Sequence, residues 1–180
     1  MKKRILSFAI LLIAFVFSTS VEAQSFKELD KSPMDCASYP SDYKISDKLV
    51  KIIYSRPQLN ERSLSLLAPE GQVWRTGANE ASEITFYEDV VFGGEKVKAG
   101  TYTIFSIPGE KEWTVILSTA KNVWGSYFYK EDQDVVRVTG TVSKSEEPIE
   151  AFTIVFDGDE DNIKMHLGWA DTIVSVPLKK

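Results

Sequence analysis

The alternation of apolar and polar residues is the feature that most limits how this chain can fold. Short segments place apolar side chains at every second position, as in Val50, Ile52 and Tyr54, and no long segment keeps a helical period. A period of two puts one face of a strand against a core and the other toward solvent. Turn-forming stretches such as 92–95 and 108–111 separate the segments. The pattern predicts an all-β fold, a single antiparallel β-sandwich or jelly-roll-like domain.

The expected strands lie at regular spacing along the chain. We place them at residues 49–55, 82–87, 89–91, 96–98, 101–107, 113–118, 136–142, 152–156, 163–169 and 174–178. A long connection, residues 58–80, separates the first core strand from the second. Leucines in it have a weak helical spacing, and a connection of this length in a compact domain is often functional. We expect a long loop or short helix that caps one end of the sandwich.

The first residues have the composition of a signal peptide that is removed. Positive residues at 2–4 precede an apolar run at 5–17, and Val21 and Ala23 suit a cleavage site. A membrane-spanning helix needs about 20 apolar residues, so an uncleaved anchor is the less favoured alternative. We expect cleavage after Ala23 and a periplasmic or secreted protein.

The mature chain is acidic and of single-domain length. Removal of residues 1–23 leaves 157 residues and moves the formal charge from −5 to −7, because three positive charges and one negative charge are lost. An acidic domain repels phosphate backbones, so nucleic acid is excluded as an expected partner. No second apolar run could span a membrane. We expect an irregular N-terminal arm at 24–47 and the β-sandwich domain at 48–180.

The chain has one cysteine and one histidine, which limits its chemistry. Cys36 cannot form an internal disulfide, and no histidine lies near it in sequence. His166 alternates with Met165 and Leu167, so we expect it on the solvent face of a strand. A Ser-His-Asp triad is disfavoured because no nucleophile-elbow pattern exists, and zinc is disfavoured because its sites use several such ligands. We predict no metal and no cofactor.

Acidic residues offer two weaker hypotheses. The run 157–162 begins like a calcium-binding loop, but Asn162 stands where the glycine belongs and Gly168 where the last ligand belongs. An acidic hairpin tip is therefore the favoured interpretation. Paired carboxylates could also hydrolyse a glycosidic bond. The carboxylates considered for that role are Glu80, Glu83, Glu88 and Asp89.

Residues 73–81, Val-Trp-Arg-Thr-Gly-Ala-Asn-Glu-Ala, form the most distinctive stretch. In one interpretation, the Trp74 ring, the forked donors of Arg75 and the Asn79 amide hold a sugar or an acidic peptide end. In the other, which we favour, Trp74 plugs one end of the sandwich while Arg75 and Asn79 hydrogen-bond carbonyls of the long loop. The candidate ligand-binding residues are Trp74, Arg75, Thr76, Asn79, Tyr54 and Arg56.

These motifs also carry a resemblance to a known family. With 73–79, the stretches that carry it are 32–33, 54–57, 84–86, 99–102, 107–109, 113–116, 124–125, 152–154 and 169–177. The chain resembles the domain of unknown function (DUF) 2911 family of exported bacterial proteins over nearly all of its mature length. The resemblance implies an exported β-rich domain and names no substrate. It also shows departures: Glu70 and residues 60–65 replace an aromatic and a glycine-containing motif, so a pocket that used that aromatic is altered or lost.

Two functional classes remain open. The first is a non-catalytic exported protein that binds a sugar, a peptide or an envelope partner at the long-loop end. The second is a carboxylate-based hydrolase or lyase acting on a polysaccharide. Two carboxyl groups facing each other across a groove at Trp74 would favour the enzyme. We favour the binding protein.

Overall fold

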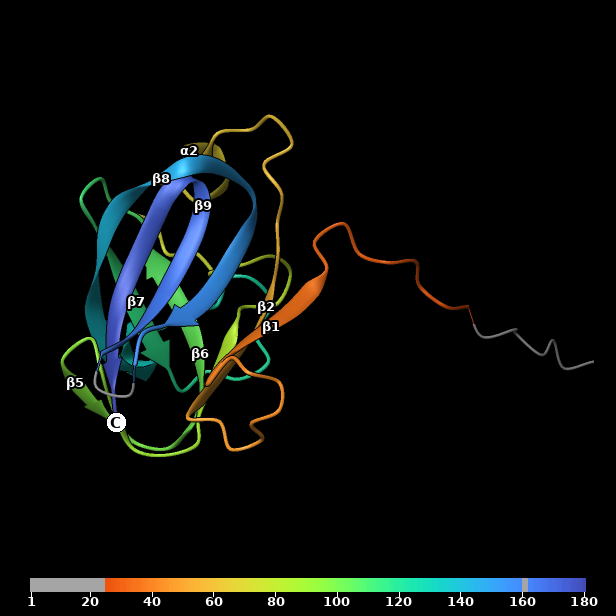
Figure 1. Cartoon of the computed structure of the whole chain (residues 1–180). Helices are drawn as coiled ribbons and strands as arrows, with labels where there is room; N and C mark the ends of the chain where they lie inside the picture. Colours follow the sequence, from red (N-terminus) through yellow and green to blue (C-terminus); the bar gives the residue numbers. More distant parts are fainter. Residues whose placement is uncertain (1–24, 160–161) are drawn as a thin grey trace, which may run out of the picture.

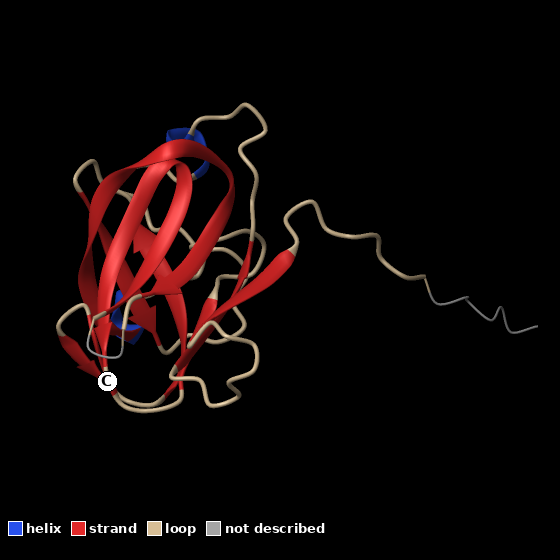
Figure 2. Cartoon of the chain, in the orientation of Figure 1, coloured by secondary structure: helices blue, strands red, loops and turns tan. Residues whose placement is uncertain are grey.

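The computed structural model describes residues 25–159 and 162–180. Within these residues, nine antiparallel strands form one sheet in the order β1-β2-β3-β6-β7-β8-β9-β4-β5. Strands dominate the fold, and the only described helical pieces are short (Figure 2). The all-β antiparallel prediction is confirmed. The elements are β1 (Met34–Tyr39), β2 (Val50–Ser55), α2 (Leu64–Leu67), β3 (Glu83–Phe86), β4 (Val90–Phe92), β5 (Glu95–Val97), β6 (Gly100–Ile107), β7 (Glu112–Ser118), η1 (Glu131–Gln133), β8 (Asp134–Asp157) and β9 (Ile163–Lys179).

The two longest strands, β8 and β9, give the sheet its sandwich form because each turns back on itself. The pairing of β8 with β9 shifts register on both sides of Ile149, and β9 turns where Ala170 has a φ of 54°. Each strand therefore has two limbs, one before and one after its bend. The first limb of β8 pairs with the second limb of β9, where Thr141 lies opposite Ser175, and the second limb of β8 pairs with the first limb of β9. Figure 1 shows β8 arching around β9, with both in front of β6 and β7. We call this curved pair the β8–β9 arch.

The core lies between these two layers and contains the side chains that the alternating pattern placed inward. Val50, Ile52 and Ile84 are fully buried, and most inward residues of the arch are buried as well, while Val136 and Val142 are partly buried. The long connection places α2 between β2 and β3, as predicted. Ser63 caps this helix by accepting a hydrogen bond from the backbone N–H of Leu66. A second, smaller core cluster on the outer side of β6 and β7 contains Ala81, Phe105 and Ile116.

The N-terminal arm differs from its predicted form. Residues 34–39, expected to be irregular, form β1, which pairs with β2 along its whole length at one edge of the sheet. Residues 25–33 lead away from the body of the domain (Figure 1). The predicted signal peptide, residues 1–23, lies outside the described residues. Among the residues that are described, no helix has the length and apolarity needed to cross a membrane.

Candidate functional site

The Trp-Arg-Thr-Gly-Ala-Asn motif folds into a buried, strained turn. Thr76 and Asn79 adopt left-handed backbone conformations, with φ values of 54° and 60°. The Thr76 hydroxyl lies 2.8 Å from the Ser106 hydroxyl, and the Ser82 hydroxyl donates to the Thr76 carbonyl at 2.6 Å. A β-carbon at Gly77 would lie 3.0 Å from the Ser82 oxygen, so the glycine allows this close approach. Through these hydrogen bonds, the motif joins β3, β6 and the long loop inside the domain.

Arg75 and Asn79 do not make the carbonyl contacts that the favoured interpretation predicted. Neither side chain hydrogen-bonds another residue in the described part of the chain, and Nε of Arg75 is buried without a partner. Asn79 acts through its backbone, because its carbonyl accepts a hydrogen bond from the Gly125 N–H at 2.9 Å. The left-handed conformation is one that asparagine tolerates well. A clamp is present, but the hydroxyls of Thr76 and Ser82 form it.

Arg56 and Tyr54 fasten β2 to the second limb of β8. The Arg56 guanidinium donates to the Phe152 carbonyl at 3.1 Å and to the Thr153 hydroxyl at 2.7 Å, and pairs with Asp35 at 3.1 Å. The Tyr54 hydroxyl contacts the backbone of Ile154, and burial raises the pKa of this phenol. The structure thus places two of the six candidate residues in an internal strand contact, apart from the turn that holds Arg75 and Asn79.

We expect the two arginines to differ in their effect on stability. Arg56→Met removes three charge-assisted contacts and should lower the free energy of unfolding by about 2 kcal/mol. Arg75→Met removes no side-chain hydrogen bond to a described residue and keeps the apolar stem, so the free energy of unfolding should fall by less than about 1 kcal/mol. Urea denaturation of both variants tests this. A larger loss for Arg75→Met than for Arg56→Met would show that Arg75 is the clamp after all.

Trp74 lies in the core of the described residues, so its ring does not form the wall of a groove across which two carboxyl groups could face each other. It is 5% exposed, stacks on Trp169 with ring centroids 5.4 Å apart, and meets Phe152 edge-on at 5.0 Å. A fourth ring, Trp113, meets Trp74 edge-on at 6.0 Å. Trp113 in turn forms part of a pocket. The distinctive motif therefore supports the pocket from beneath instead of lining it.

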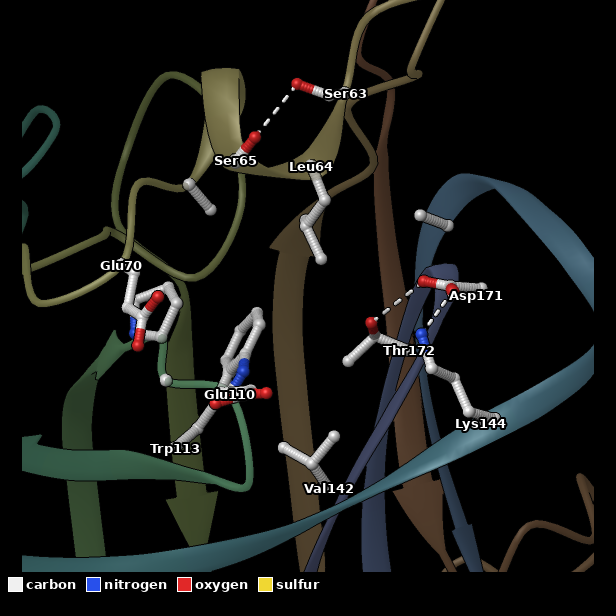
Figure 3. A pocket seen from close by; sticks show the side chains of 14 residues that line it. Ser63, Leu64, Ser65, Glu70, Glu110, Trp113, Val142, Lys144, Asp171 and Thr172 are labelled. Atoms are coloured by element: carbon white, nitrogen blue, oxygen red, sulfur yellow. Dashed lines mark hydrogen bonds and ion pairs between the residues drawn. The ribbon is translucent and has the colours of Figure 1, made fainter.

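The pocket lies at the end of the sandwich where the long loop crosses, and we call it the long-loop pocket. Its volume is about 510 Å³. Figure 3 shows Glu70, Glu110 and Trp113 on one side and Lys144, Asp171 and Thr172 on the other. Leu64 approaches from above and Val142 from below. The residues labelled there are Ser63, Leu64, Ser65, Glu70, Glu110, Trp113, Val142, Lys144, Asp171 and Thr172.

Local backbone contacts hold the two walls in place. The long loop is attached to the β6–β7 turn because the Gly71 N–H donates to the Pro108 carbonyl at 2.9 Å. That turn is tight, since a β-carbon at Gly109 would lie 2.4 Å from the Glu112 carbonyl oxygen. The Val142 N–H donates to the Lys111 carbonyl at 3.1 Å, which joins the turn to β8. Glu70 gives this wall a carboxylate.

Trp113 presents a hydrogen-bond donor without a partner. Its ring is 4% exposed, and its indole N–H bonds no other described residue. Within the described residues, the buried side-chain atoms without a partner are Arg75 Nε and Asp134 Oδ1, so the Trp113 nitrogen retains access to the pocket. By contrast, the Trp169 indole donates to the Glu150 carbonyl at 3.2 Å. The indole N–H of a largely buried tryptophan normally finds a hydrogen-bond partner, and here a ligand atom in the pocket can supply it.

The charged groups of the pocket are mostly acidic. Lys144 pairs with Asp171 across the β8–β9 ladder, and this hydrogen bond holds the pKa of the Asp171 carboxyl below its usual range. Glu70 and Glu110 have no lysine or arginine partner among the described residues. The pocket therefore offers carboxylate acceptors, one indole donor and hydroxyl groups around apolar contacts from Leu64 and Val142.

The carboxylates singled out from the sequence lie elsewhere. Glu80 and Glu83 line a separate pocket of about 410 Å³, where Glu83 accepts a hydrogen bond from the Asn122 N–H at 3.3 Å. Glu88 pairs with Lys180, and Asp89 with Lys98. Among residues 25–159 and 162–180, no cluster of three or more histidine, cysteine or acidic side chains is arranged to hold a metal ion. The acidic turn 157–162 is only partly described, because 160–161 lie outside those ranges.

His166 lies on the outer face of its strand, as predicted, but it is not a free surface histidine. Its side chain is 19% exposed. Nδ1 lies 2.8 Å from the Ser175 hydroxyl, and Nε2 lies 2.9 Å from Asp157 Oδ1. The sequence disfavoured a Ser-His-Asp grouping because no nucleophile motif accompanies the histidine. The folded arch nevertheless brings the three side chains together. The one sequence signal for this grouping is that the alternating pattern places all three side chains on the outward face of their strands.

The fold and its pocket define an all-β domain in which a long loop, fastened by a Trp-Arg-Thr-Gly-Ala-Asn turn, crosses one end above a pocket lined by apolar and acidic side chains. The chain belongs to the family described as "Protein of unknown function (DUF2911)", whose profile matches residues 32–178. This confirms the resemblance over most of the chain. No curated protein and no solved structure matches it.

Proposed function

We propose that this chain is an exported binding protein whose long-loop pocket takes an uncharged sugar residue. The indole N–H of Trp113, which bonds no other described residue and retains access to the pocket, is the observation that carries the proposal. Binding a ligand oxygen there would satisfy a donor that the fold leaves without a partner. Export is supported by the N-terminal sequence, with its positive residues, apolar run and Ala23 cleavage site.

The chemistry of the walls favours a sugar over other small ligands. A sugar hydroxyl can both donate and accept a hydrogen bond. It can therefore donate to the carboxylates of Glu70 and Glu110 and accept from the indole N–H of Trp113. Leu64 and Val142 supply apolar surface for the faces of a sugar ring. An anionic ligand would meet unpaired carboxylates, while the one lysine is already paired with Asp171. A volume of about 510 Å³ lies within the usual range for small-ligand pockets.

The same groups favour binding without turnover. Glycoside hydrolysis needs a carboxylic acid that stays protonated to donate to the leaving oxygen. The Lys144 ammonium acts in the opposite direction on Asp171, because it lowers that pKa and favours the carboxylate. Polysaccharide hydrolysis by the carboxylates of this pocket is accordingly the alternative, and the test below distinguishes it.

Calorimetric titration of the mature chain with neutral mono- to tetrasaccharides tests the proposal. We expect Trp113→Phe to keep the aromatic ring and lose the donor, which should weaken binding about 5- to 10-fold. Trp124→Phe is the matched control, since Trp124 is 57% exposed and lies outside this pocket. Its affinity should equal that of the unchanged protein.

Other outcomes would replace the proposal with a defined alternative. Binding of a lysine-rich peptide but of no sugar would make the pocket a cationic peptide site. Steady release of new reducing ends from an oligosaccharide, abolished by Glu110→Gln, would make it a hydrolase. Equal affinities in Trp113→Phe and Trp124→Phe would remove the indole donor from the site and overturn the argument.

A further inference from the structure

A second pocket lies on the outer face of the β8–β9 arch, and we call it the arch pocket. Its volume is about 530 Å³, and it shares no lining residue with the long-loop pocket. Residues from both limbs of β8 and both limbs of β9 line it. Figure 1 shows how these limbs lie beside one another in the arch. The lining residues that matter here are Ile149, Val155, Asp157, His166, Ile173 and Ser175.

The two hydrogen bonds of His166 indicate which ring nitrogen of the neutral imidazole carries the hydrogen and which one accepts a hydrogen bond. An ionised carboxylate can only accept, so the contact between Asp157 Oδ1 and Nε2 requires the hydrogen to sit on Nε2. In the neutral imidazole, Nδ1 is then a bare acceptor. The Ser175 hydroxyl, 2.8 Å away, must donate its hydrogen to Nδ1. This is the polarity with which a histidine takes the proton of a nucleophilic serine, although the two ring nitrogens are exchanged relative to the usual serine hydrolase arrangement.

We propose that Ser175 is an activated nucleophile, with His166 as its general base and Asp157 as a positioning residue, and that the arch pocket takes small uncharged carboxylic esters. Ile149, Val155 and Ile173 give the pocket an apolar part suited to a short acyl chain. Among the described residues, the Asp157 carboxylate hydrogen-bonds the imidazole, which it holds in the required tautomer.

The reaction balances with water as the co-reactant. Ser175 Oγ forms a bond to the ester carbonyl carbon while its proton moves to Nδ1 of His166. The bond from that carbon to the alcohol oxygen breaks, and the leaving alcohol takes the proton from Nδ1. Water then attacks the acyl-serine, His166 accepts and returns its proton, and the carboxylic acid leaves with Ser175 restored.

Two neighbouring hydroxyls can donate to the negative oxygen that develops during the attack. Thr141 lies directly opposite Ser175 in the β8–β9 ladder, and Ser143 lies opposite Ile173. Residues opposite or diagonal to one another in a ladder share a face, so both hydroxyls stand beside Ser175. Neither side chain hydrogen-bonds another described residue. They supply donors of the kind that stabilise a tetrahedral intermediate.

Covalent labelling with a fluorophosphonate tests the proposal on the mature chain. Ser175 Oγ should bond to phosphorus as fluoride leaves, and intact-protein mass spectrometry should show one added group. The tryptic peptide 165–179 contains a single serine, Ser175, so the site can be assigned without any variant. We expect Ser175→Ala to block labelling and His166→Gln to slow it about 100-fold or more. Ser143→Ala should slow it about 10-fold.

Asp157→Asn provides a second test that does not depend on folding. It should slow labelling about 10-fold or more at an unchanged melting temperature, because the amide no longer fixes the tautomer. Asp159→Asn, two residues away and outside the pocket, is its matched control and should label at the original rate. Labelling of His166→Gln at the original rate, or an adduct on any other peptide alone, would overturn the proposal. An absence of labelling in the unchanged protein would do the same, while sugar binding at the long-loop pocket would be unaffected.

Discussion

Trp74→Ala should lower the free energy of unfolding by about 3–5 kcal/mol, the usual range for removing a buried aromatic ring. The ring is 5% exposed and contacts three other aromatic rings, with centroids 5.0–6.0 Å away. Alanine would leave a cavity that the two tryptophans and Phe152 cannot fill, because each is held by its own strand. Urea denaturation followed by circular dichroism measures the loss.

Trp124→Ala provides the control for this substitution. Trp124 is 57% exposed in the loop between β7 and η1, so its removal should change stability by less than about 1 kcal/mol. Trp74→Phe should fall between the two, since it keeps a ring but not the full stacking on Trp169. A loss below about 1 kcal/mol in Trp74→Ala would contradict the core position and return Trp74 to the candidate ligand residues.

The parts of the fold that the sequence predicts are those fixed by local patterns. Alternating residues such as Ile84 and Phe86 mark a strand wherever one face is buried and the other is not. The edge strand β1 lacks that signal, because Met34 and Cys36 are exposed and the other positions are only partly buried. The stretch around Pro148 reads as a break between two strands. In the structure β8 continues through it and bends, which depends on its pairing with β9 and not on its own sequence.

The sequence directs attention to the long-loop end, but the residues that line the pocket there are not the ones that it singled out. The long connection does form one wall of a pocket, as its length suggested. However, Trp113 and Asp171 reach that pocket from strands that are far apart in sequence, and no spacing links them. Arg75 and Asn79 in the turn were candidates because a guanidinium and an amide are suited to hydrogen-bonding a ligand. The structure gives them a backbone role, since a left-handed turn at Asn79 is what places the neighbouring segments.

Gly93→Ala should lower the free energy of unfolding by about 3 kcal/mol. The two-residue hairpin joining β4 to β5 has positive φ values of 59° at Gly93 and 95° at Gly94, the conformation expected from the paired glycines. An alanine in either place carries a left-handed strain of about 1–2 kcal/mol. At Gly93 a β-carbon would also lie 2.4 Å from Cβ of Val138, which adds an overpacking cost of about 1–3 kcal/mol.

Gly94→Ala separates these two costs, because a β-carbon there would meet no atom within 4 Å. Its loss should be about 1–2 kcal/mol, from the backbone alone. The extra loss in Gly93→Ala then measures how firmly the hairpin is held against Val138 of β8. On its other side the hairpin is held by β9, because the Gly93 N–H donates to the Pro177 carbonyl at 2.7 Å. In the Gly93→Ala variant, a second substitution, Val138→Ala, should restore part of the stability lost to overpacking, because it removes the two methyl groups 2.7 Å from the added carbon. Equal denaturation midpoints for the two alanine variants would mean that the hairpin swings away freely, and that turn geometry alone explains the glycine pair.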